Sequence, residues 1–170
     1  MIGRLRTLRA QRGGSALVEF ALILPALLLI LAILADLGFA YHRRLLLLQG
    51  IAAGAYYASA QASGLSSSNE ADIAQTIVNI VQGITGGDVA VSVRANGVEG
   101  PAEADTFYCL NGGIGTMTST GASPATCPDM TISGKFITIS GNLIYTPVFP
   151  ALTWVASTIG VGETLTVRVK

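Results

Sequence analysis

Few residues in this 170-residue chain have the types and spacing that catalysis requires. His42 is the only histidine and lies beside two arginines, where we expect an interfacial role, so no Ser/His/Asp set can be built. The acids Glu99, Glu103 and Asp105 could together serve as general acid and base, but such a cluster is far more often the solvated face of a loop. We therefore expect that the chain is not an enzyme.

The patterns that bind metals, nucleotides and nucleic acids are also missing from the sequence. The two cysteines are 18 positions apart and have no partner histidine, which does not resemble a zinc site. The glycine cluster at residues 112–115 lacks the lysine and Ser/Thr of a phosphate loop. Beyond Gln49 the chain has four basic and eight acidic residues, a net charge of −4, whereas nucleic acid selects a basic stripe. We expect no cofactor, no metal and no nucleic-acid partner.

Two carboxylates interrupt an otherwise apolar stretch near the N-terminus. Glu19 is costly in lipid, which makes it a candidate functional residue. It also lies near the expected helix start, where it could reach the headgroups and merely complement the helix dipole. Asp36 lies late in the apolar run, and its partner could be Arg43 or a neighbouring subunit.

The apolar stretch itself is long enough to cross a membrane. Residues 16–35 contain one charge, and about 20 apolar residues span a hydrocarbon core of roughly 30 Å. Residues 1–14 carry four arginines and no acid, so the positive-inside rule predicts a cytoplasmic N-terminus and an exported C-terminus. A cleaved secretory signal is the alternative, but it requires a shorter apolar stretch. We expect a single-pass protein of the inner (cytoplasmic) membrane.

The helix is expected to continue beyond the membrane. Residues 41–63 contain no proline and are rich in leucine and alanine, which predicts one helix over residues 15–63, with a transmembrane part at about 16–40. Pro25 could bend this helix or be a tolerated membrane proline. Gly50 and Gly54 form a small-xxx-small face on which another helix could approach closely, although alanine-rich helices also produce this spacing by chance.

The remainder, residues 64–170, is expected to be an exported α+β domain. After a turn at residues 64–69, Ser67 and Glu70 have capping-box spacing and predict a second helix that ends at Gly83. Alternating stretches near residues 89–93, 137–145 and 165–169 predict a three- to four-stranded antiparallel sheet on which this helix packs. Residues 95–134 are expected to form a long, variable, exposed loop. The predicted core comprises Ile73, Ile77, Ile80, Val91, Ile139, Leu143, Leu165 and Val167.

The cysteines, Cys109 and Cys127, lie within the expected loop. A disulfide between them would close a loop of nearly twenty residues and stabilise the fold by roughly 3 kcal/mol. It would also indicate an oxidising compartment, in agreement with the predicted topology. The alternative is two unpaired thiols.

The stretch RGGSALVEF at residues 12–20 resembles the processing site of type IV prepilins, in the form found in the tight-adherence branch. Residues 12–60 as a whole resemble a TadE-like minor pilin, or pseudopilin, and YTPVFP at residues 145–150 is similar to a strand and proline-bearing turn of TadE-like domains. The resemblance implies that a prepilin peptidase removes a basic leader, residues 1–14, by cutting between Gly14 and Ser15. Glu19 and Phe20 then become the fifth and sixth residues of the mature chain and take part in subunit assembly.

The resemblance implies a minor pilin of a tight-adherence type IV pilus, involved in pilus assembly, adhesion or secretion. Its implied partners are prepilin peptidase, other pilin subunits through the N-terminal helix, and the pilus assembly platform in the inner membrane. The alternative is a permanently membrane-anchored envelope protein whose exported domain binds a ligand or surface through residues 95–134. Cleavage of the leader separates the two hypotheses.

Overall fold

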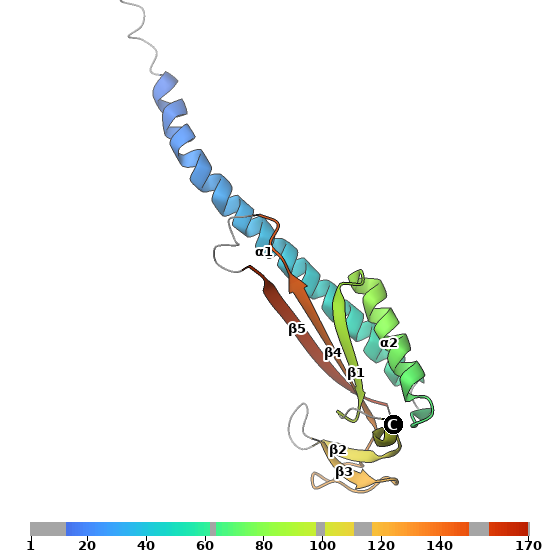
Figure 1. The fold of residues 1–170 in the computed structure, drawn as a ribbon. Helices are drawn as coiled ribbons and strands as arrows, with labels where there is room; N and C mark the ends of the chain where they lie inside the picture. The colour runs from blue at the N-terminus through green and yellow to red at the C-terminus, as the bar shows by residue number, and fades with distance from the viewer. Residues whose placement is uncertain (1–12, 62–63, 98–100, 111–116, 150–156, 170) are drawn as a thin grey trace, which may run out of the picture.

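The computed structural model describes residues 13–61, 64–97, 101–110, 117–149 and 157–169, and it confirms the predicted α+β fold (Figure 1). Two α-helices accompany a three-stranded and a two-stranded antiparallel sheet. In chain order the elements are α1 (Gly13–Gln61), α2 (Glu70–Thr85), β1 (Val89–Ala95), the 3₁₀ helix η3 (Pro101–Asp105), β2 (Phe107–Leu110), β3 (Met117–Gly121), β4 (Phe136–Tyr145) and β5 (Ile159–Arg168).

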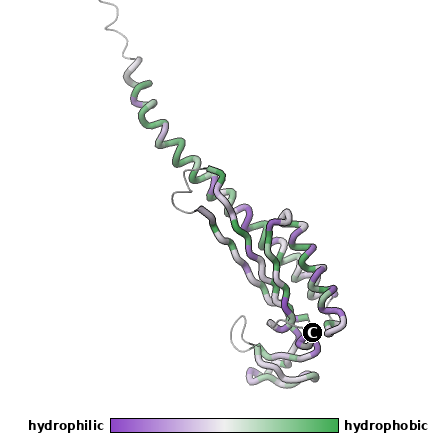
Figure 2. Tube along the Cα trace, viewed as in Figure 1, coloured by the Kyte–Doolittle hydropathy of each residue, from purple (hydrophilic) through white to green (hydrophobic). Residues whose placement is uncertain are grey.

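Helix α1 has 49 residues and behaves as two parts. Residues 13–35, here called the projecting segment, extend away from the other elements and are mostly hydrophobic (Figures 1 and 2). From Asp36 onward one side of the helix is buried at intervals of three or four residues, the spacing of a single helix face. The residues of this stripe are Asp36, Ala40, Leu47, Gly50, Ile51, Gly54, Ala55 and Ala58.

The second half of α1 and helix α2 cover the three-stranded sheet, whose order is β1-β4-β5. Together with the sheets and α2, this half of α1 is here called the body. The predicted residues Ile77, Ile139 and Leu143 are buried in its core. Ile73, Val91 and Val167 pack partly buried against that core.

Two residues of the predicted core, Leu165 and Ile80, are not buried in it. Leu165 is 41% exposed although it pairs with the fully buried Ile139, because β5 is an edge strand and has a neighbouring strand on one side only. Ile80 is only half-buried and is not part of the core cluster. The alternating pattern identified the correct strands but could not show which of them lies in the centre of the sheet and which lie at its edges.

The ends of α2 differ from the capping pattern expected from the sequence. Asn69, not Ser67, is the N-cap residue, and the Ser67 backbone N–H donates to Asp105 Oδ1 at 3.2 Å. The helix continues past Gly83 to Thr85 and ends at Gly86, whose φ of 88° is left-handed. The Gly86 N–H closes the last turn by donating to the Gln82 carbonyl at 2.9 Å.

The small-residue face of α1 is occupied by α2 of the same chain. A Cβ atom added at Gly54 would lie 3.0 Å from Ile77 Cγ2, and one added at Gly50 would lie 3.2 Å from Val81 Cγ1. The two helix backbones can therefore approach closely only because these positions carry no side chain.

Residues 95–134 contain more structure than the expected loop. Strands β2 and β3 pair as an antiparallel hairpin at the end of the body farthest from the projecting segment (Figure 1). Tyr108 of β2 exchanges two backbone hydrogen bonds with Gly134, at 2.8 and 2.9 Å, which ties the hairpin to the approach of β4. The sequence of β3, MTSTG, has too little apolar alternation to predict a strand.

We predict that Gly54→Leu lowers the free energy of unfolding by roughly 1–3 kcal/mol, because the new side chain overpacks the contact between α1 and α2. Gly83→Ala is the matched control, since a Cβ there meets nothing within 4 Å and alanine favours a helix by about 0.5–1 kcal/mol. Denaturant unfolding of detergent-solubilised protein, followed by circular dichroism, measures both. Equal stability of Gly54→Leu and the wild type would show that the contact is loose.

Candidate functional site

The predicted processing and assembly residues all lie on the projecting segment of α1. Gly14 lies in the first turn of the helix, so the bond to Ser15 lies within that turn. Glu19 and Phe20 follow one turn later, and both are exposed. Pro25 is also exposed and is contained within the continuous helix. These residues are therefore far along the helix from the body, on a segment that other molecules can reach (Figure 1).

Asp36, at the junction of the projecting segment and the body, is fully buried, with 0% of its surface exposed. Its Oδ1 accepts hydrogen bonds from the Tyr145 hydroxyl at 3.0 Å and from the Val148 N–H at 2.8 Å. Its Oδ2 accepts a third from the Phe149 N–H at 3.0 Å. The partner that the sequence left open is therefore the turn at residues 145–149, which we call the β4 turn.

The local sequence explains why the β4 turn presents these donors. Strand β4 ends at Tyr145, and Pro147 cannot donate to a sheet because it has no N–H. The next two backbone N–H groups, of Val148 and Phe149, are thus free to turn toward the carboxylate of Asp36. The signal in the sequence was an acid in an apolar run, which requires donors, but nothing local pointed to donors 109 or more residues away.

Burial raises the pKa of Tyr145 above its usual value, and the hydrogen bond to Asp36 and the charge of Asp36 raise it further, against a smaller opposing effect of Arg43. The hydroxyl therefore stays protonated at neutral pH and remains a donor. Hydrogen bonds to a charged group contribute about 1.5–3 kcal/mol each, and a buried donor without an acceptor costs a similar amount. The contact is accordingly sensitive to loss of the carboxylate.

Two further polar contacts join α1 to α2 and β5 about two turns beyond Asp36. Arg44 forms an ion pair with Glu163 of β5, with 2.6 Å between Nη2 and Oε1. Arg43 Nη1 donates to the carbonyl of Thr85, the last residue of α2, at 3.4 Å. The side chain of Arg44 is half exposed, and exposed pairs of this kind contribute at most about 1 kcal/mol. These contacts orient the body less strongly than the buried Asp36 does.

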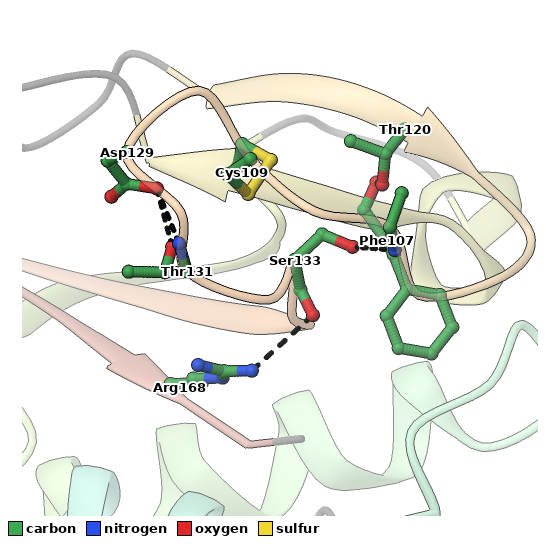
Figure 3. The surroundings of a disulfide bond; sticks show 9 residues. Phe107, Cys109, Thr120, Asp129, Thr131, Ser133 and Arg168 are labelled. Atoms are coloured by element: carbon green, nitrogen blue, oxygen red, sulfur yellow. Dashed lines mark hydrogen bonds between the residues drawn. A yellow bond between two sulfur atoms is a disulfide. The ribbon is translucent and has the colours of Figure 1, made fainter.

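At the opposite end of the body, a disulfide joins Cys109 of β2 to Cys127, as predicted (Figure 3). Their Cα atoms are 5.7 Å apart, and both residues are buried. Beside the bond, the backbone N–H and hydroxyl of Thr131 donate to Asp129 Oδ1, and these bonds lower the pKa of Asp129. Arg168 of β5 reaches the Ser133 carbonyl at 3.4 Å.

Two buried polar side chains attach the disulfide-bonded hairpin to the rest of the body. Asn96 accepts a hydrogen bond from the Phe136 N–H at 2.8 Å and donates to the Glu103 and Thr106 carbonyls. Lys135 donates to the Leu65 carbonyl at 2.6 Å, and its ammonium group lies 5.5 Å from the centre of the Phe107 ring. Neither residue stood out in the sequence, because each is recognised only by its contacts with distant segments.

A groove of about 540 Å³ borders the disulfide. Its walls are partly apolar and also include a carboxylate and a guanidinium, so it could accept a small or extended ligand with both apolar and polar groups. No group of three or more His, Cys, Asp or Glu side chains within the described ranges could hold a metal ion. The lining residues are Tyr108, Cys109, Leu110, Cys127, Asp129, Thr131, Ile132, Phe136, Thr166 and Arg168.

Within the part of the chain that the structure describes, α1 is the one helix long and apolar enough to cross a membrane. Its most apolar stretch has none of its residues buried, unlike a core helix of a soluble protein. The model of the TadE-like protein family matches residues 14–56, which confirms the TadE-like resemblance of the N-terminal helix. The match includes Glu19 and Asp36 but ends before the β4 turn. No curated protein and no solved structure matches the chain.

We predict that Asp36→Ala lowers the free energy of unfolding by roughly 2–4 kcal/mol, because it leaves the Tyr145 hydroxyl and two backbone N–H groups without their acceptor. Tyr145→Phe removes one donor and keeps the carboxylate, so it should cost only about 1 kcal/mol. Hydrogen–deuterium exchange of the Val148 and Phe149 amides measures the contact directly. Unchanged protection of both amides in Asp36→Ala would show that the carboxylate does not hold the turn.

We predict that replacing both Cys109 and Cys127 by serine lowers the free energy of unfolding by roughly 3 kcal/mol in the chain-entropy model. Ser119→Ala, an exposed position on β3, is the control and should change stability little. Mass spectrometry of unreduced peptides establishes the bond, and denaturant unfolding measures its contribution. Two freely alkylated thiols in protein isolated without a reducing agent would contradict the pairing.

Proposed function

We propose that this chain, TadE-like over residues 14–56, is a minor pilin of a tight-adherence type IV pilus with a structural role in pilus assembly, adhesion or secretion. The observation that carries the proposal is the projecting segment, an apolar half-helix attached to a body that already has its own core. A protein in water does not leave an apolar surface of this extent exposed, so lipid or another protein must cover it. In a pilin, lipid covers this segment first and neighbouring subunits cover it later.

The proposed orientation places the N-terminus in the cytoplasm and residues 64–170, the exported domain, on the other side of the inner membrane. The four arginines before the apolar run support this orientation through the positive-inside rule. The disulfide supports it independently, because such bonds persist in oxidising compartments. The proposed partners in the membrane are prepilin peptidase and the pilus assembly platform.

Processing between Gly14 and Ser15 would change the charges at the tip of α1. It would remove the basic leader, residues 1–14, and expose an α-amino group whose reference pKa of about 7.7–8.0 leaves it mostly protonated at neutral pH. Each mature subunit would then carry a cation at its helix tip and the Glu19 carboxylate four residues later. Among staggered helices, the carboxylate of one subunit can pair with the amine of the next. In a poorly solvated core, this pair would fix the axial register, because an unpaired partner is costly.

A permanently anchored envelope protein that binds a ligand is the second candidate. The groove of about 540 Å³ beside the disulfide favours it, because that groove lies at the end of the body farthest from the projecting segment. The two candidates differ at the N-terminus. Intact-mass analysis of membrane-extracted protein should find a chain that begins at Ser15 for a pilin and at Met1 for a plain anchor.

We predict that Glu19→Gln is cleaved and inserted into the membrane nearly as well as the wild type but does not enter the pilus. The reason is loss of charge at nearly unchanged size, which removes the partner of the neighbouring amine. The experiment expresses the variant in the native host, confirms the Ser15 terminus and assays sheared filaments for the subunit. Glu163→Gln, which removes an acid of the body, is the control and should be incorporated. Normal incorporation of Glu19→Gln would exclude Glu19 from assembly.

A further inference from the structure

We propose that the β4 turn, residues 145–149, lies in the lipid–water interface of the membrane and forms a second membrane contact beside α1. The inference rests on the proposed membrane-spanning role of the projecting segment. It concerns the exported side of the bilayer before the subunit enters a filament. The evidence is the axial position of Asp36, the exposure of the apolar side chains in the turn, and the order of residue types along α1.

The depth of the β4 turn follows from helix geometry. Residues 16–35 of α1 extend for about 30 Å at 1.5 Å per residue, the thickness of a hydrocarbon core. Asp36 is the next residue, so it lies at the outer edge of that core. The backbone nitrogens of Val148 and Phe149 lie 2.8 and 3.0 Å from its carboxylate oxygens. These two residues therefore lie at the same depth as Asp36.

The side chains of the turn suit that depth. Val148 is 68% exposed and Phe149 is 38% exposed, although both are apolar. Leu34 and Leu37 of α1, which flank Asp36 in sequence, are also exposed. Apolar side chains of this kind gain free energy when they leave water, which the headgroup boundary can supply in part. The apolar surface of the projecting segment thus continues onto the turn.

The order of residue types along α1 places the interface at the same level. Beyond Asp36 the helix presents the exposed aromatic residue Tyr41 and then the basic residues Arg43 and Arg44. Tyrosine is enriched at headgroup depth, and long basic side chains extend from apolar surroundings toward water. The β4 turn lies between the apolar run and these residues, where an interfacial contact is expected.

The carboxylate also explains why the turn is held at this depth. An acid at the edge of a hydrocarbon core is costly unless donors surround it, and the turn supplies three. In return, two backbone N–H groups of the turn are satisfied by protein, so their residues can approach lipid without an unpaired donor.

The experiment measures the depth of a single tryptophan by fluorescence quenching in nanodiscs that each hold one full-length chain. Trp154 is the only tryptophan, so a Trp154→Phe chain is the dark background. Val148→Trp in this background reports on the turn, and Phe149→Trp is the more conservative second probe. The lipids carry bromine either near the headgroup end or near the tail end of the acyl chains. One chain per disc excludes a neighbouring subunit as the cause of quenching.

We expect lipids brominated near the headgroup to quench both turn probes, Val148→Trp and Phe149→Trp, strongly, and lipids brominated near the tail end to quench them weakly. Met130→Trp, on an almost fully exposed residue distant from the membrane, is the water control and should not be quenched. Leu28→Trp, in the projecting segment, should be quenched most by bromine near the tail end. Turn probes that behave like Met130→Trp while Leu28→Trp is quenched would overturn the inference and leave the membrane span intact. An unquenched Leu28→Trp would overturn the span as well.

Discussion

The buried carboxylate of Asp36 is the constraint on which the arrangement of the molecule depends. A carboxylate within an apolar helix must find donors, and the β4 turn supplies a hydroxyl and two backbone N–H groups. Close packing at Gly50, Gly54 and Gly141 limits sliding along α1 in the middle of the body. The three hydrogen bonds to Asp36 add a directional contact at the junction with the projecting segment. Asp36 therefore sets where the body begins along α1 and how much of the helix projects from it.

One helix thus serves two environments, and the residues change where the environment changes. Before Asp36 nearly every side chain is apolar and exposed, as lipid or a neighbouring apolar helix requires. After it the helix becomes amphipathic, and two glycines allow α2 to approach. Gly141 of β4 has the same role on the sheet side, since a Cβ there would lie 2.6 Å from Leu47 Cδ1. At these contacts a glycine of one element lies against a side chain of the facing element, which lets the second half of α1 pack closely on α2 and β4.

The sequence predicted the features that depend on local pattern. Both helices and the three strands of the larger sheet follow from periodicity, and the cysteine pairing was predicted because the chain has two cysteines in one segment. It could not predict that Asp36 meets Tyr145, because no periodic signal links residues 109 positions apart. It missed the β2–β3 hairpin because a disulfide and two buried polar side chains, Asn96 and Lys135, hold that hairpin where apolar alternation is absent. It misplaced Leu165 because alternation does not distinguish an edge strand from a central one.

The internal packing also limits how copies of this chain could associate in the proposed filament. The small-residue face at Gly50 and Gly54 is covered by α2, so it is not available to a helix of another subunit. In the proposed filament, the apolar surface of α1 that remains for such contacts is the projecting segment, whose exposed side chains are large, such as Leu22 and Phe20. Large apolar side chains pack without directional preference, so they hold helices together but fix their register weakly. In the proposed mature chain this segment would carry two charges, the Ser15 α-amino group and the Glu19 carboxylate, and these would be the groups that set the register.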